Sequence, residues 1–214
     1  MPEDINANRI LVIGCPGSGK STFARKLRDA TGLPLYYLDM IFHRPDRSTA
    51  SREEFDSALS EILAKDRWII DGNYLRTLPL RLRACDLVFF FDLPVDICIS
   101  GAASRIGTRR EDLPWTEESL DPEFLQYIKD FPKDQLPEIK RLLAELADTG
   151  SPRPADLEDT GSPRPADPED ASRSRLGNLN DAAAVPGTKP SVITFTTRQQ
   201  ADQYIAHLRR PTGI

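Results

Sequence analysis

The sequence predicts an α/β fold, with a five-stranded parallel sheet that carries helices on both faces. Short apolar runs, which are typical of buried strands, alternate along the chain with longer segments of helical spacing. The first apolar run leads directly into a glycine-rich loop and then into a helical segment. Strands that alternate with helices pair in parallel, because each helix returns the chain across the sheet before the next strand begins.

The predicted elements follow one another along the chain. Apolar runs of strand length stand at residues 9–13, 34–39, 67–71, 86–92 and 191–195. Helical spacing is found at 20–30, from 51 to about 65, after Pro94, after Pro122 and at 198–209. Ser51 and Glu54 have the spacing of a capping box, which predicts a helix start. Asp121 precedes Pro122, so we expect an N-cap aspartate with proline at the first helical position.

An insertion interrupts the domain between its fourth and fifth strands. The segment "DTGSPRPADLE" (148–158) is followed at once by "DTGSPRPADPE" (159–169), a tandem repeat with one change, Leu157 against Pro168. Residues 148–190 hold seven prolines and no aromatic residue, so they have too little apolar surface to build a core. We therefore expect one domain made of residues 1–147 and 191–214, interrupted by a disordered linker at 148–190.

The composition narrows the class of protein. A formal net charge of −5 gives no overall positive field, so we expect no nucleic-acid partner. The apolar stretch "DLVFFFDL" is far shorter than the ~20 residues of a membrane-spanning helix, and "MPEDINANRI" lacks the pattern of a signal peptide. Cys15, Cys85 and Cys98 form no C-x-x-C pair and are predicted to be reduced thiols. We therefore expect a cytoplasmic protein without membrane association.

The glycine-rich loop "GCPGSGKS" (14–21) meets every position of the P-loop pattern, between a predicted strand and a predicted helix. Its glycines allow successive backbone N–H groups to face phosphate oxygens, and the helix N-terminus adds partial positive charge. Lys20 is predicted to reach the β- and γ-phosphates, and the Ser21 hydroxyl to bind Mg²⁺. The fold is therefore predicted to be that of the P-loop NTPases. The predicted nucleotide-binding residues are Gly14, Cys15, Pro16, Gly17, Ser18, Gly19, Lys20, Ser21 and Thr22.

A P-loop also requires a carboxylate near the magnesium ion, at the end of a neighbouring strand. Two predicted strands end in aspartate, Asp71 and Asp92, and in a parallel sheet both would lie at the ligand-binding edge. Asp71 is favoured because Gly72 and Asn73 follow it and let the backbone approach the phosphates. Asp92 is also a candidate N-cap for the next helix, and periodicity alone does not choose between the two.

Basic side chains gather in "SRIGTRRED" (104–112), after the helix that follows the fourth strand. Guanidinium groups are suited to bidentate phosphate contacts and to transition-state charge, so Arg105, Arg109 and Arg110 are candidates for both. Gly107 is a candidate hinge for a short lid that closes over the phosphates. The alternative is an ordinary loop with solvated charges. Arg76, after "DGNYL", is a further candidate on the other side of the site.

Apart from the linker, the chain resembles P-loop kinases of the adenylate kinase type. It resembles more closely the bacterial DNA topology modulation proteins, which are described as adenylate kinase-like. The segments that carry the resemblance are "RILVIGCPGSGKSTFARKL", "GLPLYYLDMIF", "REEFDSALSEILAKDRWIIDGNYLRTLPLRL", "RIGTRREDLPW" and "TRQQADQYIAHL". Within them, "DGNYLRT" is similar to the adenylate kinase segment "DGFPRT" with one residue added.

The resemblance implies roles for single residues. It places Asp71 with Ser21 in the magnesium shell, and Arg76 on the phosphate of the acceptor. "GTRRED" is similar to the lid segment of those kinases, which implies that Arg105, Arg109 and Arg110 clamp the phosphoryl group in transit. Asp39 matches an aspartate that holds the acceptor hydroxyl in related small-molecule kinases, which makes it a candidate general base. The predicted catalytic residues are thus Lys20, Asp39, Arg105, Arg109 and Arg110, and the predicted substrate contacts are Asp39, Asp71, Asn73 and Arg76.

Together these observations predict an ATP-dependent phosphotransferase that uses Mg²⁺ and passes the γ-phosphate to a small acceptor, with a nucleotide as one candidate. The chain lacks the N-K-x-D motif of guanine-specific proteins, and the resemblance favours ATP as donor. We expect a monomer or a homodimer. The first alternative is a nucleotide-binding regulator associated with DNA topology, without kinase turnover. The second alternative is a motor or remodelling ATPase, for which the sequence supplies no recognisable second domain.

Overall fold

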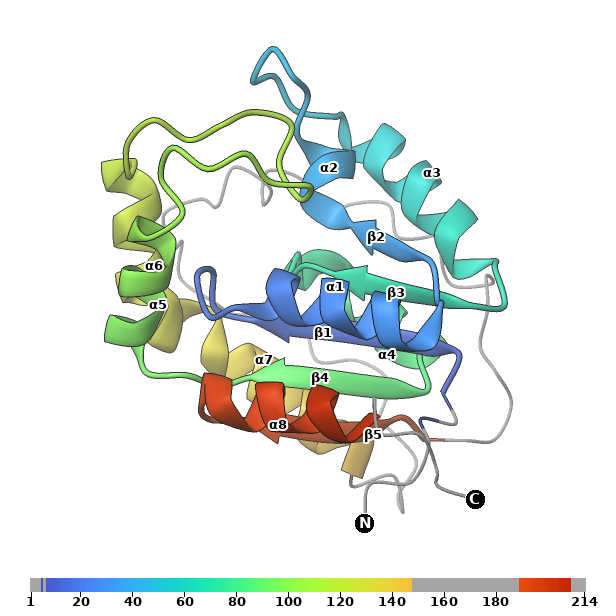
Figure 1. Ribbon diagram of the computed structural model, residues 1–214. Helices are drawn as coiled ribbons and strands as arrows, with labels where there is room; N and C mark the ends of the chain where they lie inside the picture. The colour runs from blue at the N-terminus through green and yellow to red at the C-terminus, as the bar shows by residue number, and fades with distance from the viewer. Residues whose placement is uncertain (1–4, 6, 148–188, 209–214) are drawn as a thin grey trace, which may run out of the picture.

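Five parallel strands form the sheet predicted from the sequence. The computed structural model describes residues 5, 7–147 and 189–208, so the linker predicted at 148–190 lies outside the described residues except for its last two. The strands are β1 (Arg9–Gly14), β2 (Leu35–Tyr37), β3 (Trp68–Asp71), β4 (Leu87–Phe91) and β5 (Ser191–Phe195). Their order in the sheet is β2-β3-β1-β4-β5, and every neighbouring pair is parallel (Figure 1).

Helices cover both faces of this sheet, as expected for a parallel one. The helices are α1 (Lys20–Thr31), α2 (Leu38–Phe42), α3 (Arg52–Leu63), α4 (Leu78–Ala84), α5 (Val95–Ala103), α6 (Pro122–Asp134), α7 (Leu136–Ala147) and α8 (Arg198–Leu208), with a 3₁₀ turn at Leu75–Thr77. α1 and α8 lie side by side on one face, and α4 and α7 lie on the other (Figure 1). The predicted α/β fold is therefore confirmed.

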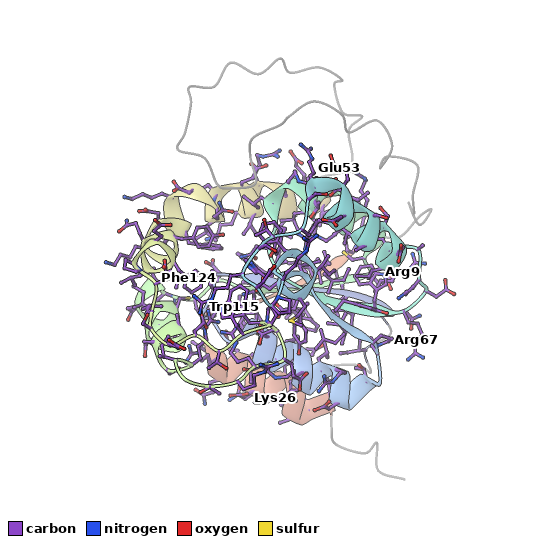
Figure 2. All side chains as sticks on the ribbon, turned by 90° about the horizontal axis from the view of Figure 1, so that it is seen from above. Arg9, Lys26, Glu53, Arg67, Trp115 and Phe124 are labelled. Atoms are coloured by element: carbon purple, nitrogen blue, oxygen red, sulfur yellow. The ribbon has the colours of Figure 1, made fainter. Side chains whose placement is uncertain are left out.

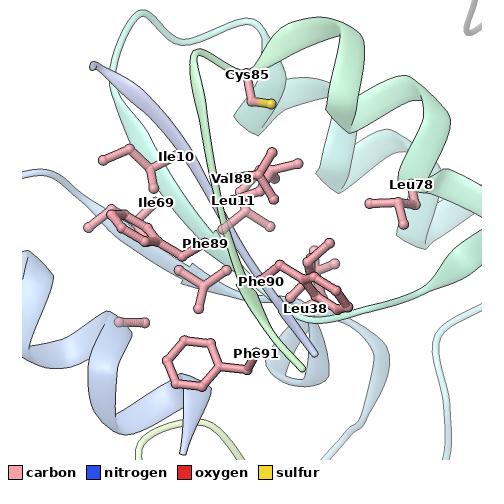
Figure 3. Close-up of a cluster of buried hydrophobic side chains, with 14 of the residues drawn as sticks. Ile10, Leu11, Leu38, Ile69, Leu78, Cys85, Val88, Phe89, Phe90 and Phe91 are labelled. Atoms are coloured by element: carbon pink, nitrogen blue, oxygen red, sulfur yellow. The ribbon is translucent and has the colours of Figure 1, made fainter. Parts of the chain in front are cut away.

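The central strands form the core, because both of their faces are covered. Phe89 and Phe91 of β4 point toward α1, where the ring of Phe23 meets them edge to face at centroid distances of 4.8 and 5.4 Å. Val88 and Phe90 point to the opposite face, where α4 lies (Figure 3). The continuous apolar run of this strand reflects burial on both sides, whereas a half-exposed strand would show alternating polar residues.

Two predicted helix starts are confirmed by their hydrogen bonds. Ser51 Oγ accepts from the Glu54 N–H at 3.2 Å, and Glu54 accepts from the Ser51 N–H at 2.7 Å, which completes the capping box of α3. Asp121 Oδ1 accepts from the Phe124 N–H at 2.9 Å and caps α6. Both caps satisfy N–H groups that the first turn of a helix leaves without a partner.

The second strand was predicted too long. It ends at Tyr37, and the chain turns at once into α2, which therefore carries Asp39 in its first turn. Leu38 is fully buried there and lies against Gly72, where an added Cβ would approach Leu38 Cβ to 2.9 Å. α4 and α7 were not predicted, because Pro79 and Pro137 stand near their starts. Proline is tolerated in a first helical turn, where its missing N–H has no partner to lose.

The segment between α5 and α6, residues 104–121, arches from α5 toward α2 (Figure 1). We call this segment the lid. Its Trp115 ring lies 5.2 Å from the His43 ring, measured between centroids, so the lid touches the end of α2.

Among the described residues, no helix is long and apolar enough to cross a membrane.

Candidate active site

The P-loop packs tightly against the elements beneath it, and its glycines make this possible. Gly14 (φ 143°) and Gly17 (φ 79°) both have the positive φ that side chains disfavour. A Cβ at Gly14 would lie 2.5 Å from the Phe91 carbonyl oxygen, and one at Gly17 would lie 2.1 Å from that of Cys98. The loop therefore rests directly on β4 and α5.

The N-terminus of α1 is left open by the loop. Its N-cap, Gly19, makes no side-chain capping bond, and the first turn contains no acidic residue. The leading N–H groups of the helix and the partial positive charge of its dipole therefore face the adjacent cavity. Such an end binds anions readily.

A cavity of about 410 Å³ lies beside this helix end. Residues 17–22 of the predicted nucleotide-binding set line it, whereas Gly14, Cys15 and Pro16 do not. Six basic side chains stand around it against two acidic ones, so the cavity has the charge of a site for a polyanion. The basic residues are Lys20, Arg25, Lys26, Arg105, Arg110 and Arg198, and the acidic ones are Asp112 and Asp202. Figure 2 shows Lys26 on α1 in a view from above.

Cys15, the second residue of the loop, lies beneath this cavity. It is buried and hydrogen-bonds to Cys98 of α5, and this bond together with burial raises the pKa of the Cys15 thiol. The three cysteines are all buried free thiols, which confirms the prediction that they form no disulfides.

Asn73 fixes the start of the P-loop to the end of β3. Its Oδ1 accepts from the Gly14 N–H at 2.8 Å, and its Nδ2 donates to the Gly14 carbonyl at 2.7 Å. Asn73 was predicted from sequence to contact substrate, and in the structure both of its amide groups are used by the P-loop backbone. The side chain is 8% exposed, so water is not available to replace either bond.

We expect Asn73→Ala to lower the free energy of unfolding by about 2–4 kcal/mol, because two buried backbone groups lose their partner. Urea denaturation of the variant and of the wild type measures this difference. Asn8→Ala is the matched control, since Asn8 is exposed and its side chain makes no contact of this kind. Equal losses in the two variants would contradict the role given to Asn73.

Asp71 lies at the carboxyl end of β3, beside the P-loop. It is 4% exposed, and its Oδ1 is buried without a hydrogen-bond partner. Burial raises the pKa of Asp71 to about 6, and Lys20 and a hydrogen bond from Ser21 pull it partly back down. A buried carboxylate oxygen without a partner is costly, so this geometry suits a cation that is present during function.

Asp112 is a site residue that the sequence interpretation missed. It is 3% exposed in the cavity wall and binds the Arg110 guanidinium through both oxygens, at 3.1 and 2.9 Å. Burial would raise its pKa, but the hydrogen bonds and charge of Arg110 hold that pKa below its usual value. Arg25 of α1 stands 3.7 Å from the same carboxylate. Asp112 stands within "GTRRED", and a carboxylate among arginines near a phosphate site was the available signal.

The three predicted lid arginines have different surroundings. Arg110 lines the cavity and is held by Asp112 and by Glu117 at 2.8 Å. Arg105 also lines the cavity, lies 3.4 Å from Glu117, and has a pKa lowered by burial and by the charge of Arg110. Arg109 is exposed and does not line the cavity. The guanidinium of Arg105 also stacks over the Phe124 ring, with 5.5 Å between Cζ and the ring centroid. In the view of Figure 2, Phe124 lies farther than Trp115 from the middle of the molecule.

The predicted acceptor residues lie around α2 and the loop after β3. Asp39 accepts a hydrogen bond from the Tyr74 hydroxyl at 2.9 Å. Arg76 is held by Asp56 of α3 through two hydrogen bonds of 2.6 and 3.0 Å. His43 follows the last residue of α2, the helix that carries Asp39. Burial lowers the pKa of His43, and the charge of Asp39 raises it in part. An acceptor bound here would meet a carboxylate, aromatic rings and an arginine that already has a partner.

Asp92, the other candidate for the metal site, faces a different part of the molecule. Its carboxylate forms an ion pair with Lys140 of α7 at 2.8 Å, and it lines a groove formed with β5. Asp92 is therefore engaged away from the P-loop, whereas Asp71 interacts with Lys20 and Ser21. The assignment of the metal ligand to Asp71 stays a prediction.

The residues present fit a magnesium ion. The candidate donors are the Ser21 hydroxyl and the Asp71 carboxylate, both oxygen ligands of the kind that Mg²⁺ prefers. The unpartnered Oδ1 of Asp71 supports this assignment. Among the described residues no group of three or more His, Cys, Asp or Glu side chains could hold a metal ion. This is compatible with Mg²⁺, which is usually bound by one or two protein groups together with substrate phosphates.

Comparisons with known proteins give two kinds of result. No protein-family model matches the chain. No curated protein sequence matches it either. The resemblance to DNA topology modulation proteins therefore stays a prediction.

Solved structures give weak matches. The chain is similar to a shikimate kinase from Acinetobacter baumannii in complex with shikimate, at 16% identity and a TM-score of 0.45, over 64% of this chain and 80% of that one. A gluconokinase from Sinorhizobium meliloti 1021 matches at 18% identity and a TM-score of 0.39, over 65% and 91%. A sugar kinase from a Janibacter species matches at 16% identity and a TM-score of 0.41, over 92% and 90%.

Proposed function

We propose that the protein is an ATP-dependent phosphotransferase that acts on a small hydroxyl-bearing acceptor. The observation that carries the proposal is an uncapped helix N-terminus with Lys20 in the wall of one basic cavity, and the buried carboxylate of Asp71 close enough to Lys20 and Ser21 for both to lower its pKa. An anion-binding helix end next to a carboxylate with a free oxygen matches the needs of a nucleotide phosphate chain bound together with a divalent cation.

In this proposal, residues 17–22 hold the donor phosphates through their backbone N–H groups. Lys20 neutralises charge on the β- and γ-phosphates, and it lies in the same cavity wall as Arg105 and Arg110. Ser21 and Asp71 would hold Mg²⁺, which supplies charge neutralisation on the phosphate oxygens when it is bound. Positioning and electrostatic stabilisation account for most of the catalysis in reactions of this type.

The acceptor hydroxyl is proposed to bind at Asp39, which takes up its proton as the new bond forms. The acceptor oxygen bonds to the γ-phosphorus, the bond from that phosphorus to the β–γ bridging oxygen breaks, and ADP leaves. Arg105 and Arg110 neutralise the developing charge from the lid side. Arg110 has to exchange Asp112 and Glu117 for phosphate oxygens, so lid closure and substrate binding are coupled. Arg109 is proposed to join them when the lid closes.

Arg76 is proposed to contact the acceptor only after it separates from Asp56. An acceptor phosphate would have to compete with two hydrogen bonds to a carboxylate that is itself 18% exposed. An uncharged acceptor would leave the pair intact, and the aromatic rings of Phe42, Tyr74 and Trp115 nearby offer it apolar contact.

Isothermal titration calorimetry with ATP, in the presence and absence of Mg²⁺, tests the donor half of the proposal. We expect binding that is strengthened by Mg²⁺, and no uptake of ATP under either condition would overturn the proposal. A panel of nucleoside monophosphates, nucleosides, sugars and other small alcohols, assayed for ATP-dependent phosphorylation, then identifies the acceptor class. Binding of ATP without turnover on any acceptor would favour the alternative of a nucleotide-binding regulator.

Asp39→Asn separates the two halves of the site. We expect the variant to bind Mg-ATP with the affinity of the wild type and to lose phosphoryl transfer by about 10²–10⁴-fold, the usual contribution of a general base. Steady-state kinetics with the acceptor found by the panel, together with calorimetry, measures both. Full turnover in Asp39→Asn would exclude Asp39 as the base.

A further inference from the structure

We infer that Arg198, the first residue of α8, is a positioning residue for the phosphate cradle. Its guanidinium holds the carbonyl groups of Gly17 and Ser18, and through the planar peptide unit it orients the Gly19 N–H for a phosphate. The inference rests on the proposed function, since it assumes that phosphates bind inside the loop. It brings to the site a residue that stands 180 positions away from Ser18 in the sequence.

Arg198 makes three hydrogen bonds, all to main-chain carbonyls. Its Nε donates to the Ser18 carbonyl at 3.2 Å, and its Nη2 donates to the Gly17 carbonyl at 2.7 Å. The same Nη2 donates to the Ile97 carbonyl of α5 at 3.1 Å. Within the described part of the chain Arg198 forms no ion pair, so its hydrogen bonds to these carbonyls are its main polar contacts.

The planarity of the peptide bond converts these contacts into an orientation of the loop. In a trans peptide unit the N–H points away from the carbonyl that precedes it. Holding the Gly17 carbonyl orients the Ser18 N–H, which closes a turn onto the Cys15 carbonyl at 3.2 Å. Holding the Ser18 carbonyl orients the Gly19 N–H toward the opposite side, away from Arg198. Gly19 is the N-cap of α1, so its N–H is one of the donors that a phosphate would use.

The surrounding chain makes room for this guanidinium. A Cβ at Gly101 of α5 would lie 2.1 Å from Arg198 Nη2 and 2.1 Å from the Gly17 carbonyl oxygen. Only glycine at that position allows the P-loop, α5 and the guanidinium to meet. Arg198 itself lines the cavity beside residues 17–22.

The start of α8 is also fixed, so the base of the Arg198 side chain is held in place. Thr197 Oγ1 accepts from the Gln200 N–H at 3.3 Å, and Gln200 Oε1 accepts from the Thr197 N–H at 3.1 Å, which is a capping box. A cation in the first turn of a helix is opposed by the helix dipole, so local helix stability does not account for arginine here. The contacts of Arg198 with the P-loop account for arginine at this position.

The test compares Mg-ATP dissociation constants of the wild type, Arg198→Ala, Arg198→Lys and Arg141→Ala. Arg141 is the matched control, because its partners Glu138 and Glu145 lie with it on α7, away from the cavity. We expect Arg198→Ala to raise the dissociation constant at least tenfold, and Arg198→Lys to raise it less, because an ammonium group reaches fewer carbonyls at once. Added guanidinium ion, at a concentration that does not denature the protein, should restore part of the affinity of Arg198→Ala only.

Unfolding midpoints measured on the same samples separate positioning from stability. If Arg198→Ala does not fold, the comparison of Arg198→Lys with Arg141→Ala decides the question. Unchanged affinity for Mg-ATP in the folded Arg198 variants would overturn the inference and leave the proposed function standing. Absence of Mg-ATP binding by the wild type would instead overturn the proposed function, on which the inference rests.

Discussion

Lys20→Met is expected to lower the turnover number by about 10²–10³-fold, the loss typical of removing one preorganised group that stabilises transition-state charge. Lys20 lines the cavity at the start of α1, and its charge acts on Asp71 without a close ion pair to any described residue, so the ammonium group can also bind a phosphate. Methionine keeps the length and the apolar stem of the side chain. The backbone N–H groups still position the substrate in this variant. The loss of turnover therefore measures the contribution of the ammonium group alone.

Steady-state formation of ADP with the acceptor found by the panel measures this effect. Lys65→Met is the matched control, because Lys65 follows α3 and contacts Tyr36 and does not line the cavity. A Lys20→Met variant that transfers phosphate at the rate of the control would refute the assignment of this lysine to the donor phosphates.

Asp71→Asn is expected to have opposite effects on activity and on stability. Transfer should fall by a factor comparable to that of Lys20→Met, because the amide cannot replace a carboxylate as a magnesium ligand. The unliganded protein should become more stable at neutral pH. The pKa of Asp71 is raised from 3.8 to about 6 in the folded state, a shift that corresponds to about 3 kcal/mol.

The sign of the pH dependence follows from that shift. Between pH 3.8 and about 6 the folded state holds more protons at Asp71 than the unfolded state. The free energy of unfolding of the wild type therefore falls as the pH rises through this window. Above the window the folded state bears the full cost of a buried, ionised Asp71. Asp71→Asn removes the penalty, so the difference between the two proteins should be largest above pH 6 and vanish below pH 3.8.

Urea denaturation at several pH values, without nucleotide, measures the effect on stability. Mg-ATP should then reverse the order, since it stabilises the wild type and binds the variant weakly. A variant that is less stable than the wild type at pH 7.5, or equally stabilised by Mg-ATP, would contradict the proposed role of Asp71 as a buried carboxylate that binds the metal ion.

Most of the fold was accessible from the sequence because its signals are local. The apolar runs of β1, β3, β4 and β5 are bounded by polar residues, and the caps at Ser51 and Asp121 have fixed spacings. The edge strand β2 was predicted too long, because its three half-buried residues form too short an apolar pattern to mark where the strand ends. The helices α4 and α7 were missed, because a proline near a helix start looks the same in sequence as a proline that stops a helix.

The candidate site was only partly accessible, for a different reason. The P-loop is contiguous and has a recognisable pattern, so the sequence alone is enough to identify its residues. Arg198 acts through distant partners, and its role depends on contacts between segments that the sequence does not relate. Asp112 binds Arg110 two residues away, but its approach to Arg25 of α1 joins two segments in the same way. Likewise, Arg76 is already bound by Asp56 and Asn73 is already bound by the Gly14 backbone, so neither side chain is free for a ligand without losing a partner. Contacts between residues this far apart in sequence leave no pattern in the local sequence.

The distance along the chain between Gly17 and Arg198 has a consequence for biosynthesis. Residues 14–21 leave the ribosome early, whereas β5 and the clamp on their carbonyls are made 181 positions after Gly17. A nascent chain would therefore reach the arrangement proposed for the phosphate cradle only after Arg198 has been made, and a bound nucleotide could not assist its earlier folding. Under the proposed function, nucleotide loading would therefore follow the pairing of β5 with β4 and the docking of Arg198 on the P-loop.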